Sequence, residues 1–274
     1  MEQVGEHPVP AGPLAVRWLA YELEEQRAGV ATRARLRFQN AGTAPWRSRG
    51  REGVQLAYHW LDPLGNAIVW DGERASFPAV VQPGETVELV SPVIAPRPPG
   101  SYRLAFDLVE EFRFWFAELG SATLDLPIEV RPLIEERRLT VNVYGPVDAE
   151  LEAALSAQEE PLVTEDAVAV AHFVSGVVPA PDWSRLILDA HAEGYAVVGP
   201  AIAAESLGDR RSLAAWGPGG GRNPRFGEPL LLPSLLESLE PTMHAGLPAY
   251  PPRDGLFEGR AVVRLRSRSG RLSG

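Results

Sequence analysis

Short segments with alternating hydrophobic and polar positions fill the chain between residues 14 and 131. In LAVRWLAYEL, apolar residues occupy every second position over Leu14–Ala20, and in ATRARLRFQN the arginines alternate with Ala34, Leu36 and Phe38. A period of two residues predicts half-buried strands. Turn residues separate roughly seven to nine such segments at regular spacing, which predicts an all-β sandwich over residues 14–131.

The stretch YHWLDPLGNAIVWDG, residues 58–72, predicts a β-hairpin with a short Pro-Leu-Gly loop whose last residue, Gly65, is left-handed. The register that follows from this loop pairs Trp60 with Ile68 and Tyr58 with Trp70. All four side chains then share one face of the hairpin. A continuous apolar face favours burial of both tryptophans in the core over a ligand-binding aromatic platform.

From Pro132 onward the pattern changes to strands that alternate with amphipathic helices. RRLTVNVYG, AVAVAHFVSG and YAVVGPAI predict strands, DAELEAALSAQEE and PDWSRLILDAHAEG predict helices, and Asp182 and Gly194 suit the two ends of the second helix. This order predicts a small α/β unit over residues 133–206. The Gly, Pro and Arg content beyond it predicts an irregular segment over residues 207–274. The predicted fold class is therefore mainly β plus α/β.

Composition and charge disfavour several classes of function. The chain has no cysteine, which excludes disulfides, thiolate catalysis and cysteine zinc sites, and its net charge of −10 disfavours nucleic-acid binding. The basic end, GRAVVRLRSRSGRLSG, is interpreted as a solvated tail, with an acidic partner as the alternative. No apolar run is long enough for a membrane span and no signal peptide is recognisable, which favours a cytoplasmic location.

Candidate catalytic and metal-binding patterns are weak. GPGGGRNP lacks the spacing and the lysine of a phosphate-binding loop, and FVSGV lacks the first glycine of a serine nucleophile motif. The histidines are scattered: His7, His59, His172, His191 and His244. The strand-end carboxylates offer no way to choose a catalytic pair: Asp62, Asp71, Asp107, Glu110 and Glu111. We predict no catalytic residue, no metal site and no cofactor.

Three residues are candidates for contact with a partner or a glycan: Trp115, Arg113 and His59. Strand alternation in FRFWF buries the three phenylalanines and turns Arg113 and Trp115 outward, and in the hairpin it puts His59 on the face opposite the large apolar residues. An outward tryptophan beside an arginine can stack on a sugar or on a side chain of a partner protein. The interpretation that we prefer for Trp115 is that the α/β unit covers it.

An ordered set of motifs in the first half carries a resemblance. RFQNAGTAPW, FPAVVQPGETVEL, IAPRPPGSYRLAFDLVEE and LDLPIEV resemble the tryptophan-rich Ig-like domain of next-to-BRCA1-type autophagy receptors and its bacterial relatives, which are often attached to glycosyltransferases. The resemblance covers nearly all of residues 28–131. It implies an Ig-like sandwich that binds proteins or acts as a spacer.

The second half resembles a shortened family 2 glycosyltransferase of the GT-A fold, through LTVNVYGPVDAELEAALSAQEEP and HFVSGVVPAPDWSRLILDAHAEGYAVVGPAI. In this alignment Val174 and Gly176 occupy the positions of the two metal-binding aspartates. The resemblance therefore implies a remnant without the cation that neutralises a nucleotide diphosphate leaving group.

The predicted function is that of a non-catalytic binding or scaffolding protein with a protein or glycan partner, and the resemblance implies a place in bacterial glycan assembly. A divergent or fragmentary glycosyltransferase is one alternative, and a carbohydrate-binding module is another. The enzyme predicts a polar pocket with converging carboxylates in the α/β unit. The binding protein predicts an exposed apolar patch on the sandwich, and the carbohydrate-binding module predicts a flat aromatic side chain open to solvent.

Overall fold

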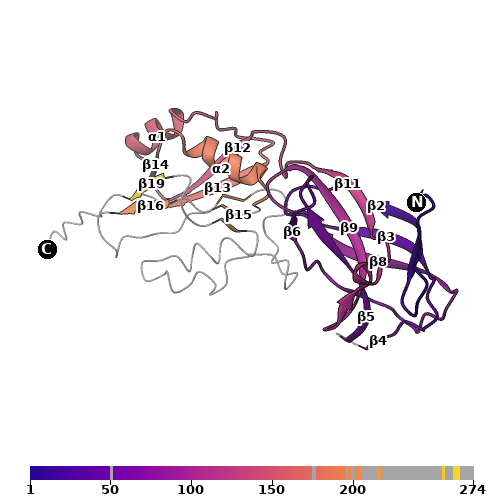
Figure 1. Ribbon diagram of the computed structural model, residues 1–274. Coiled ribbons are helices and arrows are strands. Elements are labelled where there is room, and N and C mark those ends of the chain that lie inside the picture. Colours follow the sequence, from indigo (N-terminus) through magenta and orange to yellow (C-terminus); the bar gives the residue numbers. More distant parts are fainter. Residues whose placement is uncertain are drawn as a thin grey trace. The chain divides into compact units, whose positions relative to one another are not determined.

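The chain forms two compact units, residues 1–131 and residues 132–274, which are described separately (Figure 1). The first unit is a β-sandwich, and the second contains a parallel pair of strands and two helices. The fold class predicted from the sequence is confirmed. The computed structural model describes residues 1–49, 52–174, 177–195, 197–198, 201–204, 215–216, 255–256 and 262–265. Most of the predicted irregular segment over residues 207–274 therefore lies outside the described residues, as does Gly176.

Two antiparallel sheets build the sandwich. The first has the strand order β1-β2-β3-β8, and the second has the order β10-β9-β5-β4, with β11 paired to β9 and both β6 and β7 paired to β5. The strands of the first sheet are β1 (Glu2–Gln3), β2 (Val16–Leu23), β3 (Ala31–Asn40) and β8 (Thr86–Ile94). The strands of the second are β4 (Ser48–Arg49), β5 (Glu52–Leu61), β6 (Ala67–Val69), β7 (Ala75–Ser76), β9 (Gly100–Glu110), β10 (Phe114–Trp115) and β11 (Leu124–Val130). The 3-10 helix η1 (Phe116–Leu119) follows β10 in the chain.

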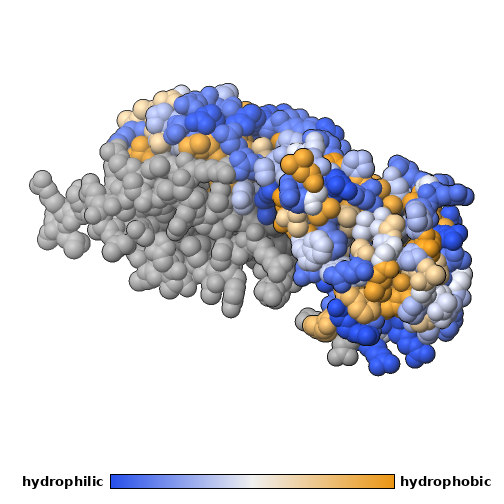
Figure 2. All heavy atoms as spheres, in the orientation of Figure 1, coloured by the Kyte–Doolittle hydropathy of each residue, from blue (hydrophilic) through white to orange (hydrophobic). Residues whose placement is uncertain are grey.

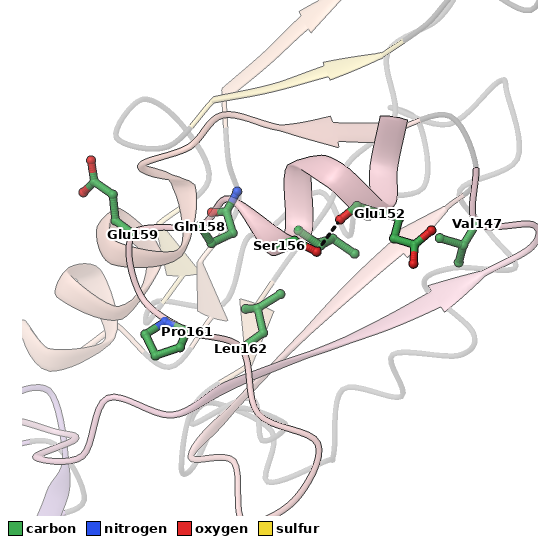
Figure 3. A pocket seen from close by; sticks show the side chains of 8 residues that line it. Val147, Glu152, Ser156, Gln158, Glu159, Pro161 and Leu162 are labelled. Carbon is green, nitrogen blue, oxygen red and sulfur yellow. Dashed lines mark hydrogen bonds between the residues drawn. The ribbon is translucent and has the colours of Figure 1, made fainter. Parts of the chain in front are cut away.

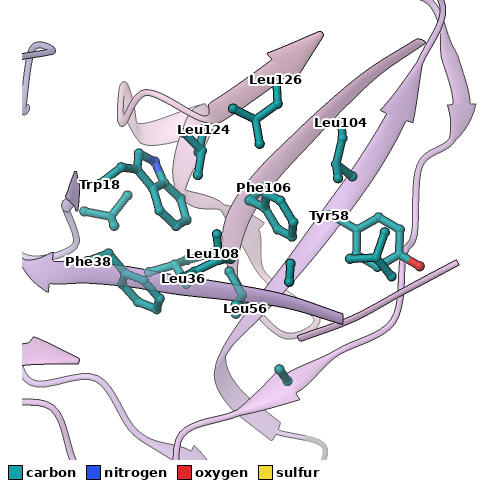
Figure 4. Packing of buried hydrophobic residues seen from close by; sticks show 14 of the residues in the cluster. Trp18, Leu36, Phe38, Leu56, Tyr58, Leu104, Phe106, Leu108, Leu124 and Leu126 are labelled. Carbon is teal, nitrogen blue, oxygen red and sulfur yellow. The ribbon is translucent and has the colours of Figure 1, made fainter. Parts of the chain in front are cut away.

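Alternate side chains of the two sheets meet in one core, as Figure 4 shows for residues of β2, β3, β5, β9 and β11. Trp18 and Phe38 of the first sheet pack with ring centroids 5.2 Å apart. Trp60 of the second sheet is fully buried, and its indole Nε1 donates a hydrogen bond to the Ile94 carbonyl at 2.9 Å. Burial of each such ring removes a large apolar area from water, which stabilises the sandwich.

The turn before Trp46 is held by a buried asparagine. The Asn40 side-chain amide donates to the carbonyls of Ala44 and Val81, and its oxygen accepts from the Gly42 amide at 3.0 Å. A Cβ at Gly42 would lie 2.2 Å from the Pro13 carbonyl oxygen, so only glycine fits at this position. Trp46 is thereby placed at 0% exposure in the core.

The hairpin register predicted from the sequence is wrong beyond its loop. The loop itself is confirmed, because Gly65 has a φ of 92° and the Asp62 amide donates to the Asn66 carbonyl at 2.8 Å. A bulge then shifts the pairing so that Trp60 lies opposite Val69. One extra residue in a strand turns the following side chains to the other face. Trp60 is therefore buried at 0% exposure, whereas Trp70 is 53% exposed.

The aromatic run FRFWF also departs from its predicted alternation. Strand β9 ends at Glu110, and the Arg113 amide donates to the Glu110 carbonyl at 3.0 Å across a turn. Phe112 occupies this turn with a φ of 63° and is 88% exposed, so its predicted burial is wrong. Phe116 is buried as predicted, and Trp115 is half-buried. The error arises because a turn interrupts what would otherwise be one strand.

The second unit begins with a parallel pair of strands, β12 and β13, joined through the helix α1. Asp148 caps α1 by accepting a hydrogen bond from the Leu151 amide at 3.0 Å, and Asp182 is the N-cap residue of α2 as predicted. Its elements are β12 (Leu139–Tyr144), α1 (Ala149–Ser156), β13 (Ala169–Val174), β14 (Val177–Pro179), α2 (Trp183–Ala192), β15 (Val197–Val198), β16 (Ala201–Ala204), β17 (Ala215–Trp216), β18 (Gly255–Leu256) and β19 (Val262–Leu265). Its core joins the strands to α2 through Phe173 and Trp183, whose ring centroids are 4.9 Å apart.

Candidate functional site

A cluster of aromatic and charged side chains lies on the outer face of the second sheet of the sandwich. Alternation along β5 turns Tyr58 and Trp60 into the core, so that His59 projects to the opposite face. The loop after β6 supplies Trp70 and Arg74, and the short strand β10 supplies Trp115. We call His59, Trp70, Arg74 and Trp115 the outer aromatic site.

The three rings of the outer aromatic site contact one another. His59 stacks on Trp70 with centroids 4.2 Å apart and an interplanar angle of 23°, and it meets Trp115 edge to face at 4.3 Å. Trp70 and Trp115 lie 6.0 Å apart at 73°. The His59 Nδ1 donates a hydrogen bond to the Trp70 backbone carbonyl. Trp70 is therefore held at both its ring and its backbone by the same histidine.

Arg74 closes one side of the outer aromatic site. Its guanidinium carbon lies 4.9 Å from the centroid of the Trp115 ring. Its Nε donates to Glu111 at 2.5 Å, one terminal nitrogen donates to the Gly72 carbonyl at 2.8 Å, and the other donates to Asp71 at 2.9 Å. All three nitrogens of Arg74 are thus engaged within the protein.

Burial shifts the pKa values of two titratable groups on this face, His59 and Asp107. Desolvation lowers the pKa of His59, so its imidazole is neutral at neutral pH and carries its proton on Nδ1. Desolvation also raises the pKa of Asp107 to about 7, although the amides of Leu108 and Ala117 donate to its carboxylate at 2.8 Å and 3.2 Å. Because Ala117 belongs to the helix that follows Trp115, Asp107 anchors the segment that carries this ring.

The structure brings together two of the three residues selected from the sequence. His59 and Trp115 are in direct contact. Arg113 has a different environment, since it pairs with Glu110 at 2.6 Å and its guanidinium lies over the Phe114 ring. Sequence reasoning missed Trp70 and Arg74. Their positions depend on the bulge in the hairpin, for which a single sequence carries no clear signal.

One face of the sandwich unit presents its apolar side chains in small groups. Figure 2 shows hydrophobic residues scattered among hydrophilic ones on the face turned to the viewer. Among the described residues, the aromatic side chains that are at least half exposed are Trp70 at 53% and Phe112 at 88%. Trp70 is stacked on a buried ring, whereas Phe112 projects from the turn after β9.

A pocket of about 610 Å³ lies in the second unit (Figure 3). Its described lining comes from α1 and the loop after it: Val147, Glu152, Leu155, Ser156, Gln158, Glu159, Pro161 and Leu162. The two carboxylates lie at opposite sides of the view, and Glu159 is paired with Arg185 at 2.6 Å. Gln158 is also engaged, because its amide donates to two backbone carbonyls. The described part of this pocket therefore shows no pair of carboxylates directed at one point.

No group of three or more metal-ligating side chains occurs in the part of the chain that the structure describes. Within the same residues, no helix is both long and apolar enough to cross a membrane. Strand β13 ends at Val174, one of the two positions that the glycosyltransferase resemblance assigns to metal-binding aspartates.

No protein-family model matches the chain, and no curated protein matches it. Solved structures match at low similarity. The C-terminal domain of wzt has 11% identity over 43% of this chain and 74% of its own, with a TM-score of 0.31. A family 123 glycoside hydrolase from Clostridium perfringens has 11% identity over 43% of this chain and 25% of its own, with a TM-score of 0.24. A PapD-like domain of human CEP192 has 15% identity over 47% of this chain and 92% of its own, with a TM-score of 0.21. These matches are distant and assign no family.

Proposed function

We propose that the β-sandwich unit is a non-catalytic binding module whose contact surface is the outer aromatic site. The observation that supports this best is the state of Trp70, which is 53% exposed yet stacked on His59 and bonded to it through its carbonyl. A tryptophan held in place before binding loses little conformational entropy when a ligand covers it. Apolar area that stays exposed contributes no hydrophobic stabilisation to the folded protein, whereas its burial under a ligand stabilises the complex.

The polar groups around this surface have structural roles that favour binding over catalysis. The Nδ1 of His59 is bonded to a backbone carbonyl, and the carboxylate of Asp107 accepts two backbone amides. Arg74 is engaged through all three nitrogens. A general acid or base has to reach a reacting group, and none of these side chains is free to do so without breaking its own contacts. We place this module in bacterial glycan assembly on the resemblance of its sequence motifs, and in the cytoplasm because no apolar run of the sequence is long enough to span a membrane.

A retention experiment tests the binding role. The full chain, its Trp70→Ala variant and its Leu64→Ala variant are immobilised and exposed separately to the soluble proteins and to the polysaccharides of a bacterial lysate. Leu64 is a matched control because it is 88% exposed and lies in the loop of the same hairpin. At least one component is expected to be retained by the wild type and by Leu64→Ala and lost from Trp70→Ala. Equal retention by all three proteins would contradict the proposal.

A calorimetric titration tests the non-catalytic part of the proposal. The full chain is titrated with UDP-glucose in the presence and in the absence of manganese. A GT-A enzyme binds such a donor through a divalent cation, so the proposal expects no heat of binding in either titration. Manganese-dependent binding would show that the second unit holds a donor site, and the protein would then have to be treated as a glycosyltransferase.

A further inference from the structure

The open surface of Trp70 is a single flat face. His59 covers one side of the indole in a nearly parallel stack at 4.2 Å, and Trp115 meets the indole edge to face at 6.0 Å. The exposed part of Trp70, 53% of the residue, therefore lies on the side opposite His59 and along the outer edge. A surface of this form accepts a ligand that is itself flat and has C–H groups on its face.

Hydrogen-bonding groups of both kinds belong to Trp70 and its neighbours. Asp71 follows Trp70 directly, its side chain is 71% exposed, and only its Oδ1 is bonded, to Arg74. Across the described residues, the indole N–H of Trp70 and that of Trp115 donate no hydrogen bond. A hydroxyl group both donates and accepts, so a polyhydroxyl ligand can use a carboxylate and an indole N–H at the same time.

The charge near the outer aromatic site disfavours an anionic ligand. The loop after β6 and the turn after β9 carry the carboxylates of Asp71, Glu73, Glu110 and Glu111. The guanidinium groups of the same segments are already paired, that of Arg74 with Asp71 and Glu111 and that of Arg113 with Glu110. A phosphate or a uronate would meet excess negative charge without a free arginine.

A cationic ligand fits no better. Recognition of an ammonium group commonly uses several aromatic walls that surround the charge. Here only one face of Trp70 is open, and the guanidinium of Arg74 already lies 4.9 Å from the centroid of Trp115. The Trp115 ring is therefore already in contact with a cation of the protein itself.

We infer that the ligand of the outer aromatic site is a neutral sugar ring that stacks on the face of Trp70 opposite His59. Its C–H face would cover the indole, and its hydroxyl groups would bond with Asp71 and the indole N–H groups. This inference rests on the proposed binding function and adds the class of ligand. The site is an open surface on one sheet, so a unit within a longer neutral polysaccharide can bind in the same way as a free sugar.

Affinity electrophoresis tests this inference with the full chain. Native gels contain dextran, mannan or xylan as neutral probes, polygalacturonate as an acidic probe, or no polysaccharide. Migration is expected to be retarded by at least one neutral probe and not by polygalacturonate. Retardation by the acidic probe alone, or by none of the four, would overturn the inference.

Three variants show whether Trp70 is the contact. Replacement of an aromatic contact residue by alanine commonly weakens binding by about 10- to 100-fold, so Trp70→Ala should lose the retardation. Trp70→Phe, which keeps a flat ring, should retain part of it, and Leu64→Ala should migrate as the wild type does. Retardation unchanged in Trp70→Ala would overturn the inference.

The retention experiment separates failure of this inference from failure of the binding function. If Trp70→Ala loses a lysate protein and no polysaccharide is retained, the sugar assignment is wrong while the binding module stands. If no component of either fraction depends on Trp70, both are wrong.

Discussion

The two faces of the β5–β9 strand pair are both buried, yet they differ in what they bury. The inner face carries Leu56, Tyr58 and Trp60, which pack against the other sheet. The outer face carries His59 at 4% exposure and Asp107 at 0%. The hydrophobic pattern explains the first face, because apolar side chains leave water when two sheets pack. It does not explain the second, where desolvation acts against two titratable groups.

The burial of His59 and Asp107 on the outer face lowers the stability of the fold. A sandwich can fold with its outer face in water, as antiparallel sheets commonly do. Here Trp70 and Arg74 from the loop after β6, together with Trp115 from β10, gather on that face. Titratable groups whose burial lowers the stability of the fold are commonly found at functional sites, and this agrees with the proposed binding role of this face.

The largest effect is expected on the inner face. Trp60→Ala removes a ring at 0% exposure and its hydrogen bond to Ile94, and should lower the free energy of unfolding by about 3–5 kcal/mol. Trp70→Ala, on the outer face, should lower it by about 1 kcal/mol or less. Urea denaturation of both variants measures the contrast. Comparable losses in the two would mean that Trp70 is part of the core.

The pH dependence of the free energy of unfolding should reveal the raised pKa of Asp107. Its pKa is raised from 3.8 to about 7, so the native state binds this proton more tightly than the unfolded chain does. Asp107 therefore lowers stability progressively as the pH rises from about 4 to about 7. In Asp107→Asn this contribution is absent. The free energy of unfolding of the variant, relative to that of the wild type, should therefore increase by on the order of 3–4 kcal/mol across that pH range.

Urea denaturation at several pH values measures this difference. Burial lowers the pKa of His59 and that of His191, so these two groups make stability rise with pH, opposite to the effect of Asp107. Both histidines are present in the variant and in the wild type, so their contributions largely cancel in the difference between the two proteins. A difference between the two proteins that stays constant from pH 4 to pH 8 would mean that Asp107 titrates normally.

An intermediate effect is expected at the ion pairs of the outer face. Arg74→Ala leaves the carboxylate of Glu111, whose side chain is 14% exposed, without its partner, and should cost about 1–3 kcal/mol of unfolding free energy. Arg113→Ala is the matched control, because the Arg113 side chain is 63% exposed and its pair with Glu110 should contribute about 0.5 kcal/mol or less. Thermal unfolding of both variants distinguishes them, and an equal effect would show that Arg74 has no special role.

The smallest effect has the opposite sign. Phe112 has a φ of 63°, which strains a residue with a Cβ, and its exposed ring contributes little to the core. Phe112→Gly should therefore raise the free energy of unfolding by about 0.5–1 kcal/mol. Phe112→Ala keeps the Cβ and should give no such gain. A loss of stability in the glycine variant would indicate that the ring packs against the protein.

The sequence predicted the sandwich, the parallel strand pair, both helices and the loop of the hairpin, because these depend on local periodicity and on turn residues such as Gly65. It also selected His59 and Trp115, since alternation along a strand assigns each side chain to a face. Its errors, at Trp70 and Phe112, both follow a point where a strand is interrupted.

The alternation along a strand assigns each side chain to one of the two faces of the sheet. A single inserted residue moves every later side chain of that strand to the opposite face. The bulge in the β5–β6 hairpin depends on how the two strands pair, with Trp60 opposite Val69 and Leu61 opposite Ala67, and the alternation within one strand does not determine this register. The local pattern therefore determined the architecture of this protein. The meeting of Trp70, Arg74 and Trp115 around His59 was decided by strand pairing in the folded sheet, because β10, which carries Trp115, lies far along the chain from β5 and reaches it only through β9.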